Sequence, residues 1–195
     1  MISDFSPGMV REARKNLGDQ NHPFAFVMID AQMLPFPAQS FDAIIANHML
    51  FHVPDRQKAL GEIQRVLRPG GQFYATTVGE KHIHELPELV VRFDPSLAAN
   101  HATETNEFTL ESGYDQLAKY FPYVEVYRQD NALHVTEADP LVDYVLSSFM
   151  LGIEEKRRGE FTRFVEREIA SNGGFIRITK DSGLFEAVLI RNGGK

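Results

Sequence analysis

The first half of the chain alternates apolar runs with amphipathic segments. Residues 6–17 carry apolar side chains at helical spacing, and Ser6 followed by Pro7 is a typical helix start. Three short apolar runs predict buried strands: 24–31, 41–49 and 72–78. A second helix is predicted over 54–67, and the sequence RPGG at 68–71 ends it. Because helices of this length separate the strands, the pattern predicts an α/β fold with a parallel sheet.

The second half of the chain has a less regular pattern. Helical periodicity recurs in four segments: 81–93, which Pro87 is expected to break, 110–121, 139–152 and 153–171. Residues 100–108 are polar and predict a loop. Alternating residues predict a strand over 123–135, and 175–192 is typical of a hairpin around the turn sequence KDSG. No repeat or linker marks a boundary, so we expect one domain over 1–195, with helical additions at 80–108 and 139–171.

Composition narrows the class of protein. With 43% hydrophobic and 24% charged residues, the chain is typical of a globular protein. It contains no cysteine, which excludes disulfides and cysteine nucleophiles and fits the reducing cytoplasm. No signal peptide pattern is present, and no apolar run reaches the roughly 20 residues that a membrane span needs. The formal net charge of -7 disfavours a nucleic-acid partner and favours a small-molecule substrate.

Polar residues follow three of the predicted strands, at the end where parallel α/β sheets bind ligands. They are Asp4, Asp30-Ala31-Gln32 and Asn47-His48. Four sequence blocks surround them: D-x-S-x-x-M at 4–9, D-A-x-x-L-P-F at 30–36, S-F-D at 40–42 and R-V-L-R-P-G-G at 65–71. In this order and at these spacings, the blocks resemble class I S-adenosylmethionine-dependent methyltransferases. The resemblance is strongest to the small-molecule group that includes the ubiquinone and menaquinone C-methyltransferases.

The resemblance implies a Rossmann-like sheet flanked by helices, with residues 1–79 as the side of the domain that binds S-adenosylmethionine or S-adenosylhomocysteine. Asp4 matches the carboxylate that accepts hydrogen bonds from both ribose hydroxyls. Phe5 and Met9 match positions that wall the adenine, although Met9 also suits the core of its helix. The charged hydrogen bonds of such a carboxylate contribute about 1.5–3 kcal/mol each.

The second and third strand ends complete the cofactor site that the resemblance implies. Asp30 matches the acceptor of the adenine amino group, with a turn residue as the alternative interpretation. Ala31 offers a backbone N–H to the ring, and Gln32 lies in the same polar segment. Asn47 matches the position where the methionine portion of the cofactor passes.

Methyl transfer asks little of protein side chains, because the sulfonium of the cofactor is already electrophilic. The enzyme supplies in-line placement and exclusion of water, and a general base is needed only when the acceptor must lose a proton. His48 and His52 flank the expected position of the methyl group and are the candidates for that base. A polar rim or packing role is the alternative for both. No histidine pair has a metal-ligand spacing, so no metal site is predicted.

In the family, a first strand with a glycine-rich loop precedes the strand that ends at Asp4. Only Met1–Ser3 stand there in this sequence, so we expect an N-terminally incomplete fold. Strand 41–49 then loses a neighbour and exposes backbone groups. A shortened chain, a degenerate protein and a strand supplied by a partner chain are the alternatives. If the chain folds alone, we expect a homodimer that covers the exposed edge.

Two functions follow from these observations. The first is S-adenosylmethionine-dependent methyl transfer to an unidentified small molecule, impaired by the missing motif. The second is a non-catalytic remnant that serves as a binding or oligomerisation module. A dinucleotide-dependent oxidoreductase is disfavoured by the LPFPAQSFD and RVLRPGG blocks, and nothing resembles a site of hydride transfer.

Overall fold

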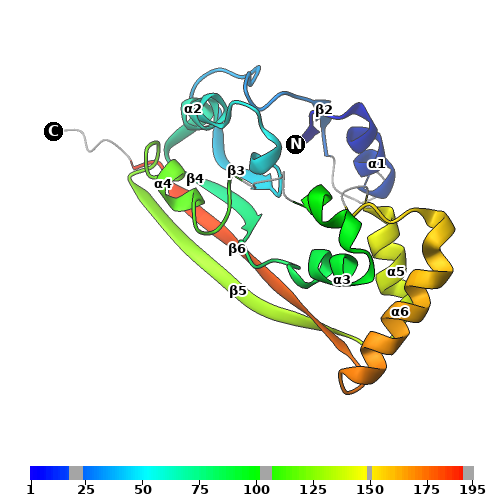
Figure 1. Ribbon diagram of the computed structural model, residues 1–195. Coiled ribbons are helices and arrows are strands. Elements are labelled where there is room, and N and C mark those ends of the chain that lie inside the picture. The colour runs from blue at the N-terminus through cyan, green and yellow to red at the C-terminus, as the bar shows by residue number, and fades with distance from the viewer. Residues whose placement is uncertain (18–23, 102–106, 149–150, 191–195) are drawn as a thin grey trace. The chain divides into compact units, whose positions relative to one another are not determined.

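The computed structural model describes residues 1–17, 24–101, 107–148 and 151–190, and the chain divides into two compact units (Figure 1). The first unit comprises 1–77, 112–127 and 184–195, and the second comprises 78–111 and 128–183. Two long strands, near 123–135 and 176–188, contribute residues to both units. The single methyltransferase-like domain expected from the sequence stays a prediction.

The strands form two separate sheets. β1 (Ile2–Asp4) and β2 (Phe26–Met28) pair in parallel in the first sheet. The second sheet has four strands in the order β3 (Phe41–Asn47), β4 (Leu67–Val78), β6 (Ile176–Val188) and β5 (Tyr123–Val135). β3 runs parallel to β4. Within the described ranges, β3 pairs only with β4 and β1 only with β2, so β3 is an edge strand, as expected.

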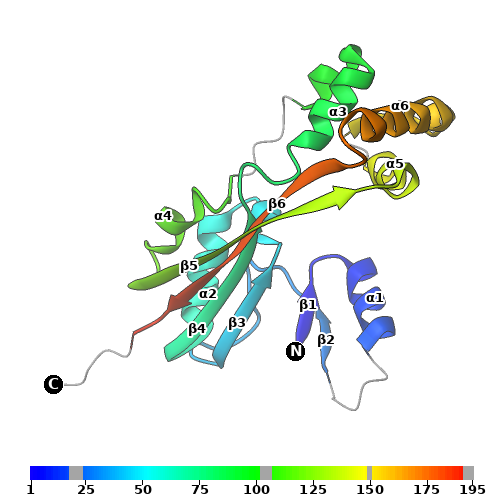
Figure 2. The ribbon, with the colours of Figure 1, turned by 90° about the horizontal axis from the view of Figure 1, so that it is seen from below.

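Two helices of the first unit begin close to where the sequence predicts. α1 (Pro7–Leu17) starts after Ser6, whose hydroxyl accepts the Met9 N–H at 3.4 Å. The short 3-10 helix η1 (Leu50–His52) precedes α2 (Arg56–Val66), which Asp55 caps by accepting the Lys58 N–H at 3.0 Å. α4 (Gly113–Leu117) is shorter than the helix predicted over 110–121. α2 and α4 lie on one face of the four-stranded sheet (Figure 2).

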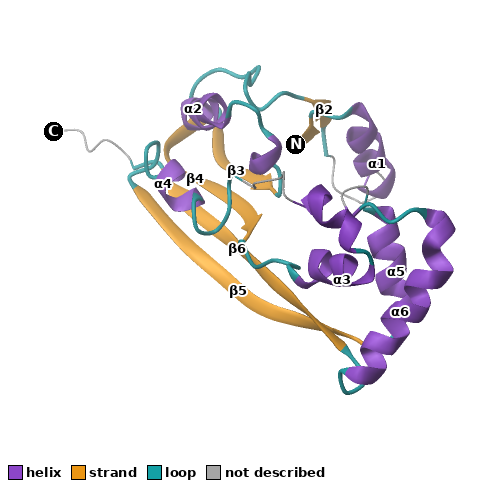
Figure 3. Ribbon diagram, in the orientation of Figure 1, coloured by secondary structure: helices purple, strands orange, loops and turns teal. Residues whose placement is uncertain are grey.

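The second unit is built around helices, shown in purple in Figure 3. They are α3 (Glu85–Phe93), η2 (Pro95–His101), α5 (Ala138–Ser147), η4 (Glu155–Arg157) and α6 (Arg158–Ser171). Their apolar faces share one core, which includes Val90, Val142 and Phe161, all fully buried. The helical additions predicted at 80–108 and 139–171 therefore pack together. Residues 102–106 of the predicted loop and 149–150 of the predicted helix 139–152 lie outside the described residues.

The hairpin predicted over 175–192 is wrong, because β6 continues without a turn through KDSG. Asp181, which is only 2% exposed, points its carboxylate at Arg128 of β5, with Nε to Oδ1 at 2.8 Å. This bidentate ion pair holds the segment extended against its neighbour. Gly183 is not among the glycines with positive φ, so the backbone makes no tight turn there.

Two further predictions are corrected by local geometry. Pro87 does not break a helix, because α3 begins at Glu85 and the proline lies in the first turn, where its missing N–H costs nothing. RPGG ends α2 as predicted but also forms the irregular start of β4, with Gly70 at φ 85. The pairing of β4 with β3 shifts register there, between Phe41 and Ala43.

Candidate functional site

The pairing of β1 with β2 brings Asp4 and Asp30 together. The carbonyl of Asp4 accepts the Ile29 N–H at 3.1 Å, so Asp30 follows directly after this contact. Oδ1 of Asp4 accepts the Ser6 N–H at 2.7 Å. Oδ2 of Asp4 has no hydrogen-bond partner in the described part of the chain and remains an acceptor for a ligand hydroxyl.

Asp30 lies in a short network that orients its carboxylate. Oδ1 accepts the backbone N–H of Gln32 at 2.8 Å and its side-chain amide at 3.0 Å. The Gln32 backbone contact, more than any other, lowers the pKa of Asp30, which is therefore ionised at neutral pH. Oε1 of Gln32 accepts the Asp55 N–H at 3.1 Å and so ties this loop to the start of α2.

Both interpretations of Asp30, as an acceptor for a ligand and as a turn residue, are compatible with this geometry. The contact with the Gln32 N–H is the turn contact of the alternative interpretation, and the carboxylate keeps lone pairs for a ligand. The backbone N–H of Ala31 has no partner within the described ranges and can donate to a ligand ring nitrogen. The cofactor role of this segment stays a prediction.

Phe5 and Met9 lie on the surface beside Asp4. Their side chains are 72% and 58% exposed, and α1 has no buried residue. The alternative of Met9 as helix core is therefore wrong. Both side chains are free to contact a flat ligand next to the Asp4 carboxylate.

Asn47 ends β3 beside a hydroxyl that sequence reasoning missed. The Thr76 hydroxyl donates a hydrogen bond to Oδ1 of Asn47 at 2.6 Å, and Oγ1 of Thr76 accepts the backbone N–H of His48 at 3.0 Å. The only signal for Thr76 was a polar residue within the apolar strand YATTV. Phe51 contacts the rings of both His48 and His52, at 6.5 and 4.4 Å between centroids. No described carboxylate hydrogen-bonds either imidazole, so neither has the orienting partner typical of a general base.

A pair of charged residues on α2 explains why two of the sequence blocks occur together. Glu62 accepts the Leu34 N–H at 2.9 Å and pairs with Arg65 at 2.7 Å. Arg65 in turn donates to the carbonyls of Leu34 and Phe36, at 3.0 and 2.8 Å. The helix therefore clamps the loop L-P-F that follows Asp30. The hydrogen bond from Arg65 is the largest cause that lowers the pKa of Glu62.

Asp42, of the block S-F-D, has a structural role. Both of its carboxylate oxygens accept hydrogen bonds from Arg68, at 2.6 and 2.7 Å. Arg68 also donates to the Gln39 carbonyl at 3.2 Å. This pair joins the start of β3 to the start of β4.

The polar groups at β1 and β2 fit one half of S-adenosylmethionine. Asp4 and Asp30 supply carboxylate oxygens as acceptors, and Ala31 supplies an N–H that has no partner among the described residues, which suit a ribose diol and an adenine ring. No glycine-rich loop connects a strand to a helix in the described part of the chain, so Asn47 is the one residue there that the resemblance assigns to the methionine half. Among those residues, no three His, Asp or Glu side chains gather as metal ligands.

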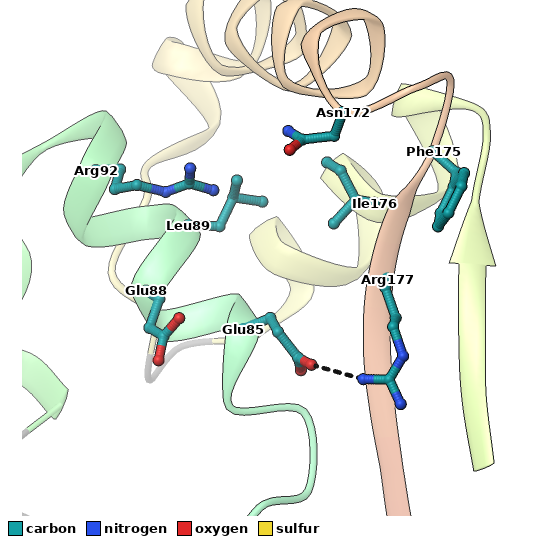
Figure 4. Close-up of a pocket in the computed structure, with 8 residues that line it drawn as sticks. All are labelled: Glu85, Glu88, Leu89, Arg92, Asn172, Phe175, Ile176 and Arg177. Atoms are coloured by element: carbon teal, nitrogen blue, oxygen red, sulfur yellow. Dashed lines mark ion pairs between the residues drawn. The ribbon is translucent and has the colours of Figure 1, made fainter.

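A cavity of about 470 Å³ lies in the second unit, between α3 and the start of β6 (Figure 4). Most of its charged groups are already paired. Arg177 contacts Glu85 at 3.8 Å, and Arg92 pairs with Glu168 at 2.8 Å. Glu85 also accepts the Thr179 N–H at 2.9 Å. None of the residues predicted to bind the cofactor lines this cavity, so it is not the site that the sequence indicated.

Residues 1–75 match the family model described as a methyltransferase domain. The ubiquinone/menaquinone biosynthesis C-methyltransferase UbiE of Methylococcus capsulatus is 36% identical over 121 residues, which cover 57% of this chain and 48% of that protein. The chain is therefore similar to S-adenosylmethionine-dependent methyltransferases, most clearly over residues 1–75. It spans about half the length of that curated relative and a smaller share of other relatives that it matches.

Solved structures support the Rossmann-like methyltransferase fold. The YcgJ protein of Bacillus subtilis aligns with a TM-score of 0.55 at 20% identity, covering 98% of this chain and 82% of that one. An N-methyltransferase of Haemonchus contortus, solved with S-adenosylhomocysteine, aligns with a TM-score of 0.53 at 17% identity, covering 97% and 43%. At these identities the likeness concerns the fold. No described helix has the length and apolar character that a membrane crossing requires.

Proposed function

We propose that the protein transfers a methyl group from S-adenosylmethionine to a small-molecule acceptor. When bound, the cofactor supplies the electrophilic methyl group. Asp4 and Asp30 accept hydrogen bonds from its ribose and adenine, and the Ala31 N–H donates to the ring. Phe5 and Met9 cover the ring, and Gln32 holds Asp30 in place. Asn47, fixed by Thr76, borders the methionine portion.

The observation that carries this proposal is the juxtaposition of Asp4 and Asp30 at the carboxyl ends of two paired parallel strands. Such strand ends are where α/β sheets bind nucleotides. The similarity to quinone C-methyltransferases suggests an acceptor about the size of a quinone. The acceptor itself stays unidentified. His48 or His52 acts only if the acceptor must lose a proton. We also propose a cytoplasmic location, with which the absence of cysteine is compatible.

Calorimetric titration with S-adenosylhomocysteine tests this proposal. We expect micromolar binding, weakened about tenfold to a hundredfold by Asp30→Ala, since a charged hydrogen bond contributes about 1.5–3 kcal/mol. Asp4→Asn is expected to weaken binding less, because one oxygen acceptor remains. Asp115→Asn, on the exposed start of α4, is the matched control and leaves affinity unchanged. No heat at millimolar ligand would contradict cofactor binding by this chain.

A specific observation favours the second candidate, a module that binds the cofactor weakly or not at all. No residue of 1–17 or 24–28 is buried, and no strand pairs with the free edge of β3 in the described part of the chain. Fusion of a strand and a glycine-rich loop from a curated relative ahead of Ile2 distinguishes the two candidates. Tighter binding and methyl transfer by the fusion favour the enzyme. An unchanged absence of binding favours the non-catalytic module.

A further inference from the structure

One face of the four-stranded sheet lies uncovered in the first unit. Figure 2 shows α2 and α4 on the opposite face, where Phe73 and Phe185 are fully buried. Alternate residues point the other way, and six of them define what we call the tyrosine face: Ile45, Tyr74, Tyr123, Glu125, Tyr127 and Glu186. Ile45 lies opposite Tyr74 in the register of β3 and β4 and is 71% exposed. Tyr123 and Tyr127 are about half exposed.

The tyrosine face carries two negative charges and no cation. Glu186 accepts hydrogen bonds from Tyr74 at 3.4 Å and from Tyr127 at 3.2 Å, and Glu125 accepts one from Tyr123. No Lys or Arg pairs with either carboxylate within the described ranges. The hydrogen bond to Glu125, with burial, raises the pKa of Tyr127 to about 12, so the phenol stays protonated and keeps donating. The hydrogen bond from Tyr123 chiefly lowers the pKa of Glu125, which stays charged.

The N-terminal segment of the same chain has the complementary character. It buries none of its described residues from Met1 to Met28, and Met28 is 62% exposed in addition to Phe5 and Met9. On α1, Arg11 has no ion-pair partner in the described part of the chain. Lys15 lies one turn further along the same side of the helix and is 76% exposed, with Glu12 at 3.7 Å. We call these two residues the basic side of α1.

Exposed apolar and aromatic side chains that gather on one face mark an interaction surface, so we expect both surfaces to have a partner. We propose that the N-terminal segment of a second copy covers the tyrosine face. The basic side of α1 supplies the cations that Glu186 and Glu125 lack. Because each copy carries both surfaces, the contact is reciprocal and closes a two-fold dimer. This dimer does not depend on cofactor binding.

Sedimentation velocity measures the oligomeric state of the whole chain directly. We expect a dimer for the wild type. Arg11→Glu and Glu186→Lys each place like charges in both contacts of a homodimer and are expected to weaken it at least about tenfold. Arg163→Glu and Glu137→Lys, on exposed positions of the second unit, are the charge-matched controls and keep the dimer.

An equimolar mixture of Arg11→Glu and Glu186→Lys provides the decisive result. In a mixed dimer, Glu at position 11 of one copy meets Lys at position 186 of the other, and the second contact pairs the two wild-type residues. Recovery of a dimer in the mixture therefore supports the proposal and shows that both variants are folded. A monomeric wild type, single variants that stay dimeric, or a mixture that stays monomeric each overturns it. Titration of the same samples with S-adenosylhomocysteine separates this outcome from that of the methyltransferase proposal.

Discussion

Removal of the Glu62 side chain tests whether the clamp on α2 stabilises the loop of the candidate site. Glu62→Ala deletes the acceptor of the Leu34 N–H and leaves Arg65 without its partner. A hydrogen bond to a charged group contributes about 1.5–3 kcal/mol, and an exposed ion pair about 0.2–1 kcal/mol. Glu62 and Arg65 are 22% and 38% exposed, so solvent screening reduces both contributions. We therefore expect a loss of about 2 kcal/mol in the free energy of unfolding.

Urea denaturation followed by far-UV circular dichroism measures this loss, which corresponds to a drop of about 4–8 °C in Tm for a chain of this size. Hydrogen exchange supplies a local readout, because the Leu34 amide loses the acceptor that protects it. Glu12→Ala is the matched control, since Glu12 is 57% exposed and lies 3.7 Å from Lys15. We expect the control to change stability by less than about 0.5 kcal/mol.

The difference between wild type and Glu62→Ala depends on pH in a defined direction. The hydrogen bond from Arg65 lowers the pKa of Glu62 in the folded state. The stability it contributes is therefore complete above the unfolded-state value, near 4.5, and is lost as the pH falls through the lower folded-state value. A variant no less stable than the Glu12→Ala control at neutral pH, or a difference that grows in acid, would refute the clamp.

Four substitutions probe packing. Phe73→Ala empties a fully buried position and is expected to cost about 3–5 kcal/mol in urea denaturation, whereas Phe5→Ala, at a 72% exposed position, stays within about 0.5 kcal/mol. Gly79→Ala places a methyl group against the carboxylate of Asp181, which its ion pair prevents from moving away, so we expect a loss of about 1–3 kcal/mol. Gly8→Ala adds a methyl group that has room in α1, where its nearest atom lies 3.4 Å away. We expect a gain of about 0.5–1 kcal/mol in the free energy of unfolding, measured by thermal unfolding. A Gly79→Ala variant as stable as the wild type would show that the backbone around residue 79 adjusts to the added methyl group.

Local signals in the sequence predicted most elements well. Ser6-Pro7 marked the start of α1, and RPGG marked the end of the helix predicted over 54–67, because such signals involve residues close in the chain. The order of strand, helix and strand also predicted the α/β class. Asp4 and Asp30 stood out as polar residues at strand ends, and the pairing of β1 with β2 places them side by side.

Contacts between distant residues decided what the sequence alone could not. KDSG has the composition of a turn, yet β6 is straight there, because Asp181 is paired with Arg128, which lies 53 residues earlier in the chain. The role of Thr76 beside Asn47 likewise depends on the register of β3 and β4.

By itself, the sequence indicated the similarity to methyltransferases, the α/β class and the positions of the polar strand ends, since these depend on local periodicity and on motif spacing. Only the tertiary structure decided that the strands form two sheets, that Met9 lies on the surface, and that three tyrosines gather on an uncovered face. Such features depend on which strands pair and which faces are covered. Pairing and burial are free-energy balances over the whole fold, which no short stretch of residues encodes.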